Sequence, residues 1–155
     1  MNIFDPKSIA HAKKLLEIYK TQLNDRFNKA IEELAELGAE TARETLRMCV
    51  TEWATGELES TITHIVDPSK NLAVVRVDSE YAIFAEFGTG IIGAGNDHPN
   101  PADGWVYDVN NHGEDGWTYF DDREQRKRWT RGQLPKAFMW SAWLEIEDKA
   151  SGLNR

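Results

Sequence analysis

The feature that most constrains the fold of this chain is a long apolar stripe at helical spacing near the N-terminus. Asp5-Pro6 is a helix-start signal, because aspartate caps helices and proline fits the first helical position. Apolar side chains then recur every three or four residues, on one face of a helix. They are Ile9, Ala12, Leu16, Tyr19, Leu23, Phe27, Ala30, Leu34 and Leu37. Such a helix is about 45 Å long, so either it lies wholly on its own sheet or part of the stripe packs on a neighbouring subunit.

Gly38 interrupts this pattern, since glycine costs about 1 kcal/mol relative to alanine inside a helix. The period resumes with Ala42, Leu46, Cys49, Val50 and Trp53. We therefore expect either two helices or one bent helix, ending near 54–56. Cys49 lies on the apolar face, which favours a buried structural thiol over a reactive one.

The period then changes to that of strands. Ser60–Val66 and Leu72–Val77 are rich in β-branched residues and flank the turn Asp67–Asn71, which predicts a β-hairpin. Ser79–Phe87 is typical of a short helix that Gly88 can end.

A second hairpin is predicted from large aromatic residues that alternate with other residues. Trp105-Val106-Tyr107 and Trp117-Thr118-Tyr119 flank the turn-forming Asn110–Gly113, so strands are expected over 104–109 and 116–120. Residues 91–103 read as a loop, and residues 121–133 as a charged connection. Pro135 precedes an amphipathic helix over 136–150.

These patterns predict an α+β fold within a single domain, residues 1–155. Long N-terminal helices (1–54) pack on a mainly antiparallel sheet of about four strands, which lies with a short helix and loops in 55–134. A C-terminal helix (135–155) covers one face. Antiparallel pairing is expected because short hairpin links cannot form parallel crossovers.

Composition excludes several classes of function. The net charge of −8 disfavours generic binding to DNA or anionic lipid. No apolar run approaches the ~18 residues that span a bilayer, and the N-terminus lacks the pattern of a signal peptide, so we expect a protein made in the cytoplasm.

Charge is distributed unevenly along the chain. Residues 121–155 carry 8 basic and 6 acidic residues, whereas the first 120 carry 10 basic and 20 acidic residues. This asymmetry suits head-to-tail contact between identical subunits.

One polar cluster has residue types that bind metals or act as acids and bases. It comprises Asp97, His98, Asp103, Asp108, His112 and Asp115. The two histidines are 14 residues apart and lack the i, i+4 spacing of a zinc hydrolase. We interpret them as solvated loop residues, with a metal-dependent hydrolase as the alternative. The glycines of 88–95 lack the lysine of a phosphate-binding loop, so no cofactor is expected.

A basic run lies beside aromatic residues near the second predicted hairpin. Arg123, Arg126, Lys127, Arg128 and Arg131 accompany Trp117, Tyr119 and Trp129. Such a mixture binds single-stranded nucleic acid in some proteins, but Asp121, Asp122 and Glu124 dilute it. A solvated or intersubunit surface is preferred, with a nucleic-acid-binding module as the alternative. The candidate interface also includes Ile91, Ile92 and Trp105.

Four segments together resemble the small tail-component family of long-tailed bacteriophages, the tail-completion or neck proteins that join tail to head. Thr55, Gly56, Leu58, Ser60 and Ile62 match a T-G-x-L-x-x-S-I segment in type and order, with Thr61 inserted before Ile62 and one residue fewer between Leu58 and Ser60. Tyr81, Ala82, Glu86, Gly88 and Thr89 match Y-A-x-x-x-E-x-G-T. Trp129–Gln133 follows. Phe138 and Met139 match the last motif, although Ala137 stands where proline is usual. The resemblance spans about residues 39–145.

The resemblance implies a virion component that acts through its surfaces and not as an enzyme. Its expected partners are copies of itself in a ring of six, neighbouring tail-tube or tail-terminator proteins, and head-side connector proteins. Nucleic acid is expected only as DNA passing through the channel. The motif residues are expected to be structural, with Tyr81 and Phe84 anchoring the short helix and Glu86 accepting hydrogen bonds from the Gly88-Thr89 loop.

Overall fold

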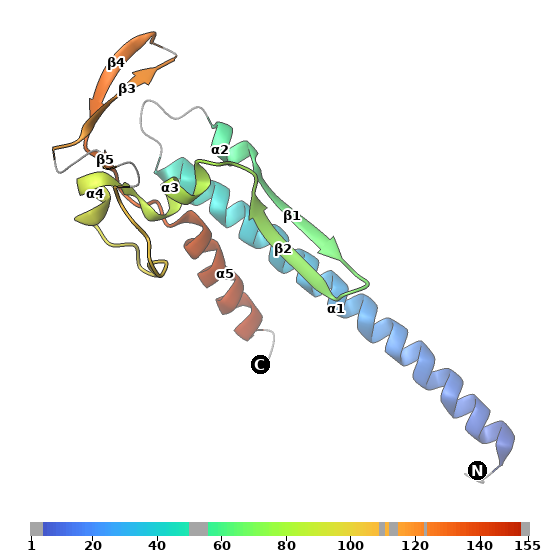
Figure 1. Ribbon diagram of the computed structural model, residues 1–155. Coiled ribbons are helices and arrows are strands. Elements are labelled where there is room, and N and C mark those ends of the chain that lie inside the picture. The colour runs from blue at the N-terminus through green and yellow to red at the C-terminus, as the bar shows by residue number, and fades with distance from the viewer. Residues whose placement is uncertain (1–4, 50–55, 109–110, 112–114, 123, 153–155) are drawn as a thin grey trace.

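The computed structural model describes residues 5–49, 56–108, 111, 115–122 and 124–152. It contains one long helix, two β-hairpins and a C-terminal helix (Figure 1), which confirms the predicted α+β class. In chain order, the elements are α1 (Pro6–Met48), α2 (Glu57–Ser60), β1 (Ile62–Asp67), β2 (Leu72–Val77), α3 (Ala82–Phe87), α4 (Gly90–Ala94), β3 (Trp117–Asp121), β4 (Arg126–Thr130), β5 (Gly132–Gln133) and α5 (Phe138–Gly152).

Helix α1 is continuous through Gly38. Its N-terminus forms as predicted, with Pro6 in the first turn and the Asp5 carboxylate accepting the Ser8 N–H at 3.2 Å. A Cβ atom at position 38 would lie 2.4 Å from Cδ1 of Ile146 on α5. Glycine is therefore present because α5 approaches α1 closely at this point, and it does not interrupt the helix.

Helix α1 ends at Met48, earlier than predicted, and residues 50–55 lie outside the described part of the chain. Cys49 is the C-terminal cap and is exposed, so the prediction of a buried thiol is wrong. The apolar period continues past the last turn in sequence, but the backbone leaves the helix before Cys49 can pack.

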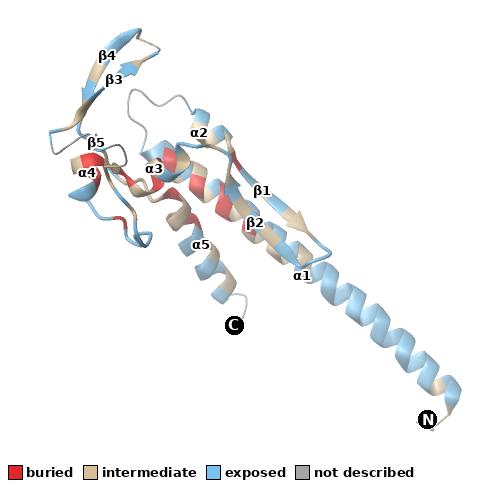
Figure 2. Ribbon diagram, viewed as in Figure 1, coloured by how far each residue is buried: buried red, intermediate tan, exposed pale blue. Residues whose placement is uncertain are grey.

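The core lies where the C-terminal half of α1 meets β1, α3 and α5. Its buried apolar residues are Ala35, Ala39, Ala42, Leu46, Ile62, Ala85, Phe138 and Ala142. The alanines allow α1 and α5 to approach closely, while Phe138 and Ile62 are the largest side chains that are fully buried. The N-terminal half of α1 extends well beyond this core and is exposed along its length (Figure 2).

The first hairpin forms as predicted. β1 pairs antiparallel with β2, from Ile62 opposite Val77 to Asp67 opposite Leu72. In the turn, the Asp67 carboxylate accepts the backbone N–H and the hydroxyl of Ser69.

The second hairpin forms with a different partner strand. β3 pairs antiparallel with β4, which lies in the segment predicted to be a charged connection, and no strand forms in 104–108, the described part of the strand predicted over 104–109. Trp105 instead packs on α3, with its ring centroid 5.9 Å from that of Phe84 and 5.3 Å from that of Phe87. The two hairpins form separate two-stranded sheets, so they do not join in one sheet of four strands.

The predicted glycine-rich loop contains the short helix α4 and is tied to β5. Thr89 and Gly90 form antiparallel bridges with Gln133 and Gly132. Gly132 has a φ of 103°, and a Cβ atom there would lie 1.9 Å from the carbonyl oxygen of Thr89. Only glycine permits this approach of the two backbones.

Among the helices of the described residues, none is long and apolar enough to cross a membrane.

Candidate functional site

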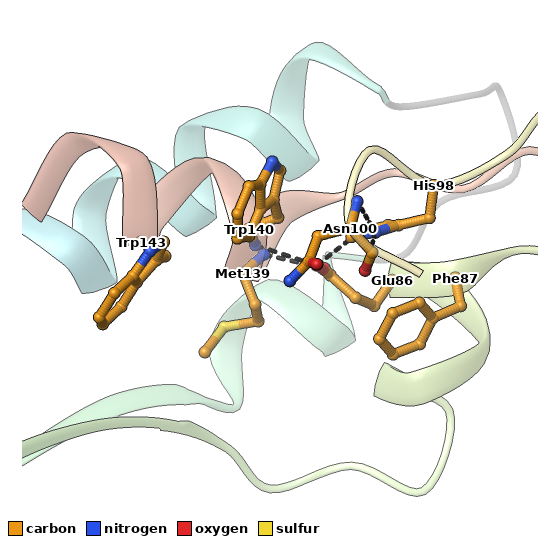
Figure 3. Close-up of a pocket in the computed structure, with 7 residues that line it drawn as sticks. All are labelled: Glu86, Phe87, His98, Asn100, Met139, Trp140 and Trp143. Atoms are coloured by element: carbon orange, nitrogen blue, oxygen red, sulfur yellow. Dashed lines mark hydrogen bonds and ion pairs between the residues drawn. The ribbon is translucent and has the colours of Figure 1, made fainter. Parts of the chain in front are cut away.

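Glu86 is a buried acid that connects three parts of the fold. It lies on α3, and its two carboxylate oxygens accept the backbone N–H groups of Met139 and Trp140, each at 2.9 Å (Figure 3). These N–H groups belong to the first turn of α5, where a helix has no internal acceptors for them. A negative charge is also favoured at this end of a helix. Glu86 therefore caps α5 from a distant position in the sequence.

His98 completes this buried pair. Its Nε2 atom donates to the Glu86 carboxylate at 3.0 Å, and its Nδ1 atom lies 2.9 Å from the backbone nitrogen of Asn100. The ring centroid of Phe87 is 4.7 Å from that of His98. Since only 3% of His98 is exposed, the interpretation of His98 as a solvated loop residue is wrong.

A shallow pocket of about 530 Å³ opens over this pair. Its lining residues are Glu86, Phe87, His98, Asn100, Met139, Trp140 and Trp143. The Glu86 carboxylate accepts three N–H groups, from Met139, Trp140 and His98. The arrangement therefore acts as a structural junction between α3, α5 and the segment around His98.

The polar cluster that the hydrolase alternative would use does not assemble in the described residues. Asp97, Asp103 and Asp115 are exposed, and His112 lies outside the described part of the chain. Within that part, no three histidine, cysteine, aspartate or glutamate side chains are placed to hold a metal ion.

Most of the motif residues have structural positions. Gly56 precedes α2 with a φ of 74°, Ser60 donates its hydroxyl to the Glu57 carbonyl, and Gly88 ends α3 with a φ of 79°. Leu58, Ala82 and Met139 pack against the buried core, to which Phe138 belongs. Thr55 lies outside the described residues.

Two expectations for the motif residues are wrong. Tyr81 is 75% exposed and does not anchor α3, whereas Phe84 does contact Trp105. Glu86 accepts hydrogen bonds as expected, but from α5 and His98 and not from the adjacent loop. Met139 lies 53 residues after Glu86, so the hydrogen bond between them cannot be predicted from local spacing in the sequence.

Acidic neighbours neutralise much of the basic run on the second hairpin. Arg128 forms ion pairs with Asp121 at 3.1 Å and with Glu124, and Arg126 also pairs with Glu124. The hydrogen bond from Arg128 is the main cause that lowers the pKa of Glu124.

The other predicted interface residues differ in exposure. Exposed are Lys127, Trp129 and Arg131, and half-buried are Ile91, Ile92, Trp105 and Trp117. Arg123 lies outside the described residues.

A row of exposed apolar side chains lies on the first half of α1, Pro6–Ala30, which we call the arm. Large apolar side chains of the predicted stripe are exposed there: Ile9, Leu16, Tyr19, Leu23 and Phe27. The arm carries six basic and two acidic residues, whereas residues 31–48 of the same helix carry two basic and five acidic residues. This division of charge lies within one helix, so a comparison of residues 1–120 with residues 121–155 does not reveal it.

An apolar groove lies next to the arm, between α1, β2 and α5. Its volume is about 330 Å³, and we call it the body groove. It is lined by Ile31, Leu34, Ala35, Ala73, Val75, Met139, Ala142, Trp143 and Ile146. Leu34 belongs to the predicted stripe, so the stripe of the arm runs into the groove along one helix.

Comparison of the chain with protein-family models, with curated proteins and with solved structures found no match in any of the three.

Proposed function

We propose that the chain is a structural subunit of the tail or neck of a long-tailed bacteriophage, where it completes the tail or joins it to the head. It acts through protein–protein contacts in a ring, with six subunits taken from the family resemblance. It is made in the host cytoplasm and functions in the virion. Its neighbours are tail-tube or tail-terminator proteins on one side and head-side connector proteins on the other, and DNA only passes through the channel.

The observation that carries this proposal is the amount of surface that the single chain leaves uncovered. The accessible surface is 11438 Å², whereas a compact monomer of 17.7 kDa exposes roughly 7,900 Å². The arm contributes a row of large apolar side chains to the excess. Each such side chain contributes about 1.5–3 kcal/mol when it is buried, so the arm is better suited to an assembly than to an isolated chain.

The positions of the motif residues also support the proposal. Segments far apart in sequence meet where Glu86 caps α5 and Phe138 enters the core. The motifs therefore serve to hold a shape. The Glu86 carboxylate, which accepts three N–H groups, contributes to this structural role.

The two alternative functions draw less support from the structure. A hydrolase needs ligands that converge on a metal, and no such group occurs among the residues that the structure describes. A nucleic-acid-binding module needs an exposed basic stripe, but Arg126 and Arg128 are paired with acidic residues of the same hairpin.

The proposal is tested by deleting the gene from the phage or prophage that encodes it and supplying the full chain in trans. We expect the deletion to yield separate heads and tails in electron micrographs, and complementation to restore joined, infectious particles. Infectious particles in the absence of both copies would contradict the proposal.

A further inference from the structure

The arm and the body groove fit each other in three respects: a helix can fill a depression, both surfaces are apolar, and the surrounding charges have opposite sign. The arm is a single amphipathic helix whose apolar stripe has no partner in the described chain, and the groove is an apolar depression with an uncovered opening. We infer that the arm of one subunit docks in the body groove of a second copy of this chain. This contact deepens the proposed function and rests on it for the ring that the contacts would close.

Charge identifies the occupant of the groove. The arm has a net charge of +4, whereas residues 31–48 of α1 have −3 and α5 has −2. An arm in the groove of another copy brings basic side chains such as Lys13 and Lys20 near acidic ones such as Glu32 and Glu147. Complementary charge sets register and speeds association. Two arms packed on each other would instead place positive charges together, so pairing between arms is disfavoured.

The chain also has enough uncovered surface for a stable interface. The arm has roughly 25 residues and is about 37 Å long. Specific interfaces bury at least ~1,000 Å² in total, and the chain exposes more than three times that area in excess of a compact monomer of its mass. Trp143 at the groove is 54% exposed, and tryptophan is the residue type that most often anchors interfaces.

Each subunit can donate its arm and receive another at the same time. The arm ends at Ala30, and the α1 residues that line the groove begin at Ile31. The arm of one copy therefore meets a different surface, the body groove, on the next copy. Contacts of this kind close into rings or continue as filaments.

Photo-cross-linking of the full chain tests the docking directly. Benzoylphenylalanine is placed at position 16 on the stripe or, as a matched control, at position 15. Both leucines are exposed, at 65% for Leu16 and 52% for Leu15, and their side chains point about 100° apart around the helix axis. Mixing ¹⁴N- and ¹⁵N-labelled protein identifies cross-links between subunits. We expect position 16 to link to groove segments 31–35, 73–75 or 139–146, and position 15 to link there far less.

Matched substitutions then measure the strength of the contact by sedimentation over a concentration series. Leu16→Gln and Trp143→Gln should each weaken self-association by about tenfold or more. Leu15→Gln and Leu144→Gln should change it by less than about twofold, because Leu144 is exposed on α5 but does not line the groove. Added salt should also weaken association, since it screens the charged side chains.

The outcomes separate this inference from the phage role. Cross-links between arms, or a single-chain mass at every concentration with no cross-link from position 16, would overturn the docking. A mass of two chains with arm-to-groove cross-links would support the docking and argue against the ring. Normal docking in a protein whose deletion leaves phage assembly intact would refute only the phage role.

Discussion

The carboxylate of Glu86 lies 2.9 Å from the backbone nitrogen of Met139, a residue 53 positions later in the chain. This hydrogen bond joins the Y-A-x-x-x-E-x-G-T segment to the F-M segment that begins α5. With the bond to Trp140 and the contact to His98, it fixes how α3, α5 and the neighbouring loop are arranged. A helix with its cap in another element is oriented by that element, so Glu86 positions α5 against α1.

Replacing Glu86 with alanine should destabilise the protein by about 3 kcal/mol, since charge-assisted hydrogen bonds contribute about 1.5–3 kcal/mol each and buried donors would be left unpaired. Glu86→Gln retains one acceptor oxygen and should cost less. Urea denaturation followed by circular dichroism measures both changes. Glu80→Ala is the control, because Glu80 is exposed and should change stability by less than about 0.5 kcal/mol. Equal effects of the variants at 80 and 86 would contradict the capping role.

Replacing His98 with alanine should also lower the free energy of unfolding, by about 1–3 kcal/mol. The change removes the hydrogen bond to Glu86 and the ring contact with Phe87. His11→Ala is the matched control, because His11 is exposed on the arm. Thermal denaturation of both variants gives the comparison, and a His98→Ala protein as stable as the wild type would show that the buried pair is dispensable.

The zinc content of the purified protein tests the alternative of a metal-dependent hydrolase. The purified protein should contain no stoichiometric zinc by elemental analysis, and the His98→Ala/His112→Ala variant should give the same value. One equivalent of zinc that is lost in the double variant would reinstate the metal site, because the histidine nitrogen is a common zinc ligand.

Gly132→Ala should be more destabilising than Gly104→Ala, although both glycines have positive φ angles, of 103° and 75°. A left-handed conformation costs an alanine roughly 1–2 kcal/mol, and this applies at both positions. Only at position 132 would the new Cβ atom also clash, with the carbonyl oxygen of Thr89, whereas a Cβ atom at position 104 meets nothing within 4 Å. Denaturation midpoints of the two variants measure the difference, and equal losses would show that the bridge between 89 and 133 is not needed.

The parts of the fold that could be predicted are those set by local pattern. Asp5-Pro6 begins α1, the β-branched runs form the first hairpin, and Gly88 ends α3, because each depends on residues within a few positions. The role of Gly38 could not be predicted from local pattern, because Ile146 on another helix occupies the space of the missing side chain. The second hairpin was misassigned for a similar reason, since Trp105 has its partners on α3.

The buried junction could be predicted only in part. The resemblance marks Glu86 and Met139 as motif residues, but nothing in their spacing shows that one caps the helix that the other begins. His98 followed by proline has the local appearance of a turn, and only its contacts with Glu86 and Phe87 explain its burial. Long-range hydrogen bonds leave no periodic signal in a single sequence.

Acidic pH should loosen the second hairpin through Glu124. The pKa of Glu124 is lowered chiefly by its hydrogen bond from Arg128. The ordinary pKa of glutamate is about 4.3. A group whose pKa is lowered by folding stabilises the folded state above that ordinary value, and this contribution is lost as the pH falls through the lower, folded-state pKa.

Amide hydrogen exchange across β3 and β4, corrected for intrinsic rates, should therefore show less protection at pH 3 than at pH 6. Glu124→Gln should weaken that dependence, whereas Glu80→Gln should leave it unchanged. Equal pH dependence in wild type and Glu124→Gln would show that the ion pairs of Glu124 with Arg126 and Arg128 do not hold the hairpin together.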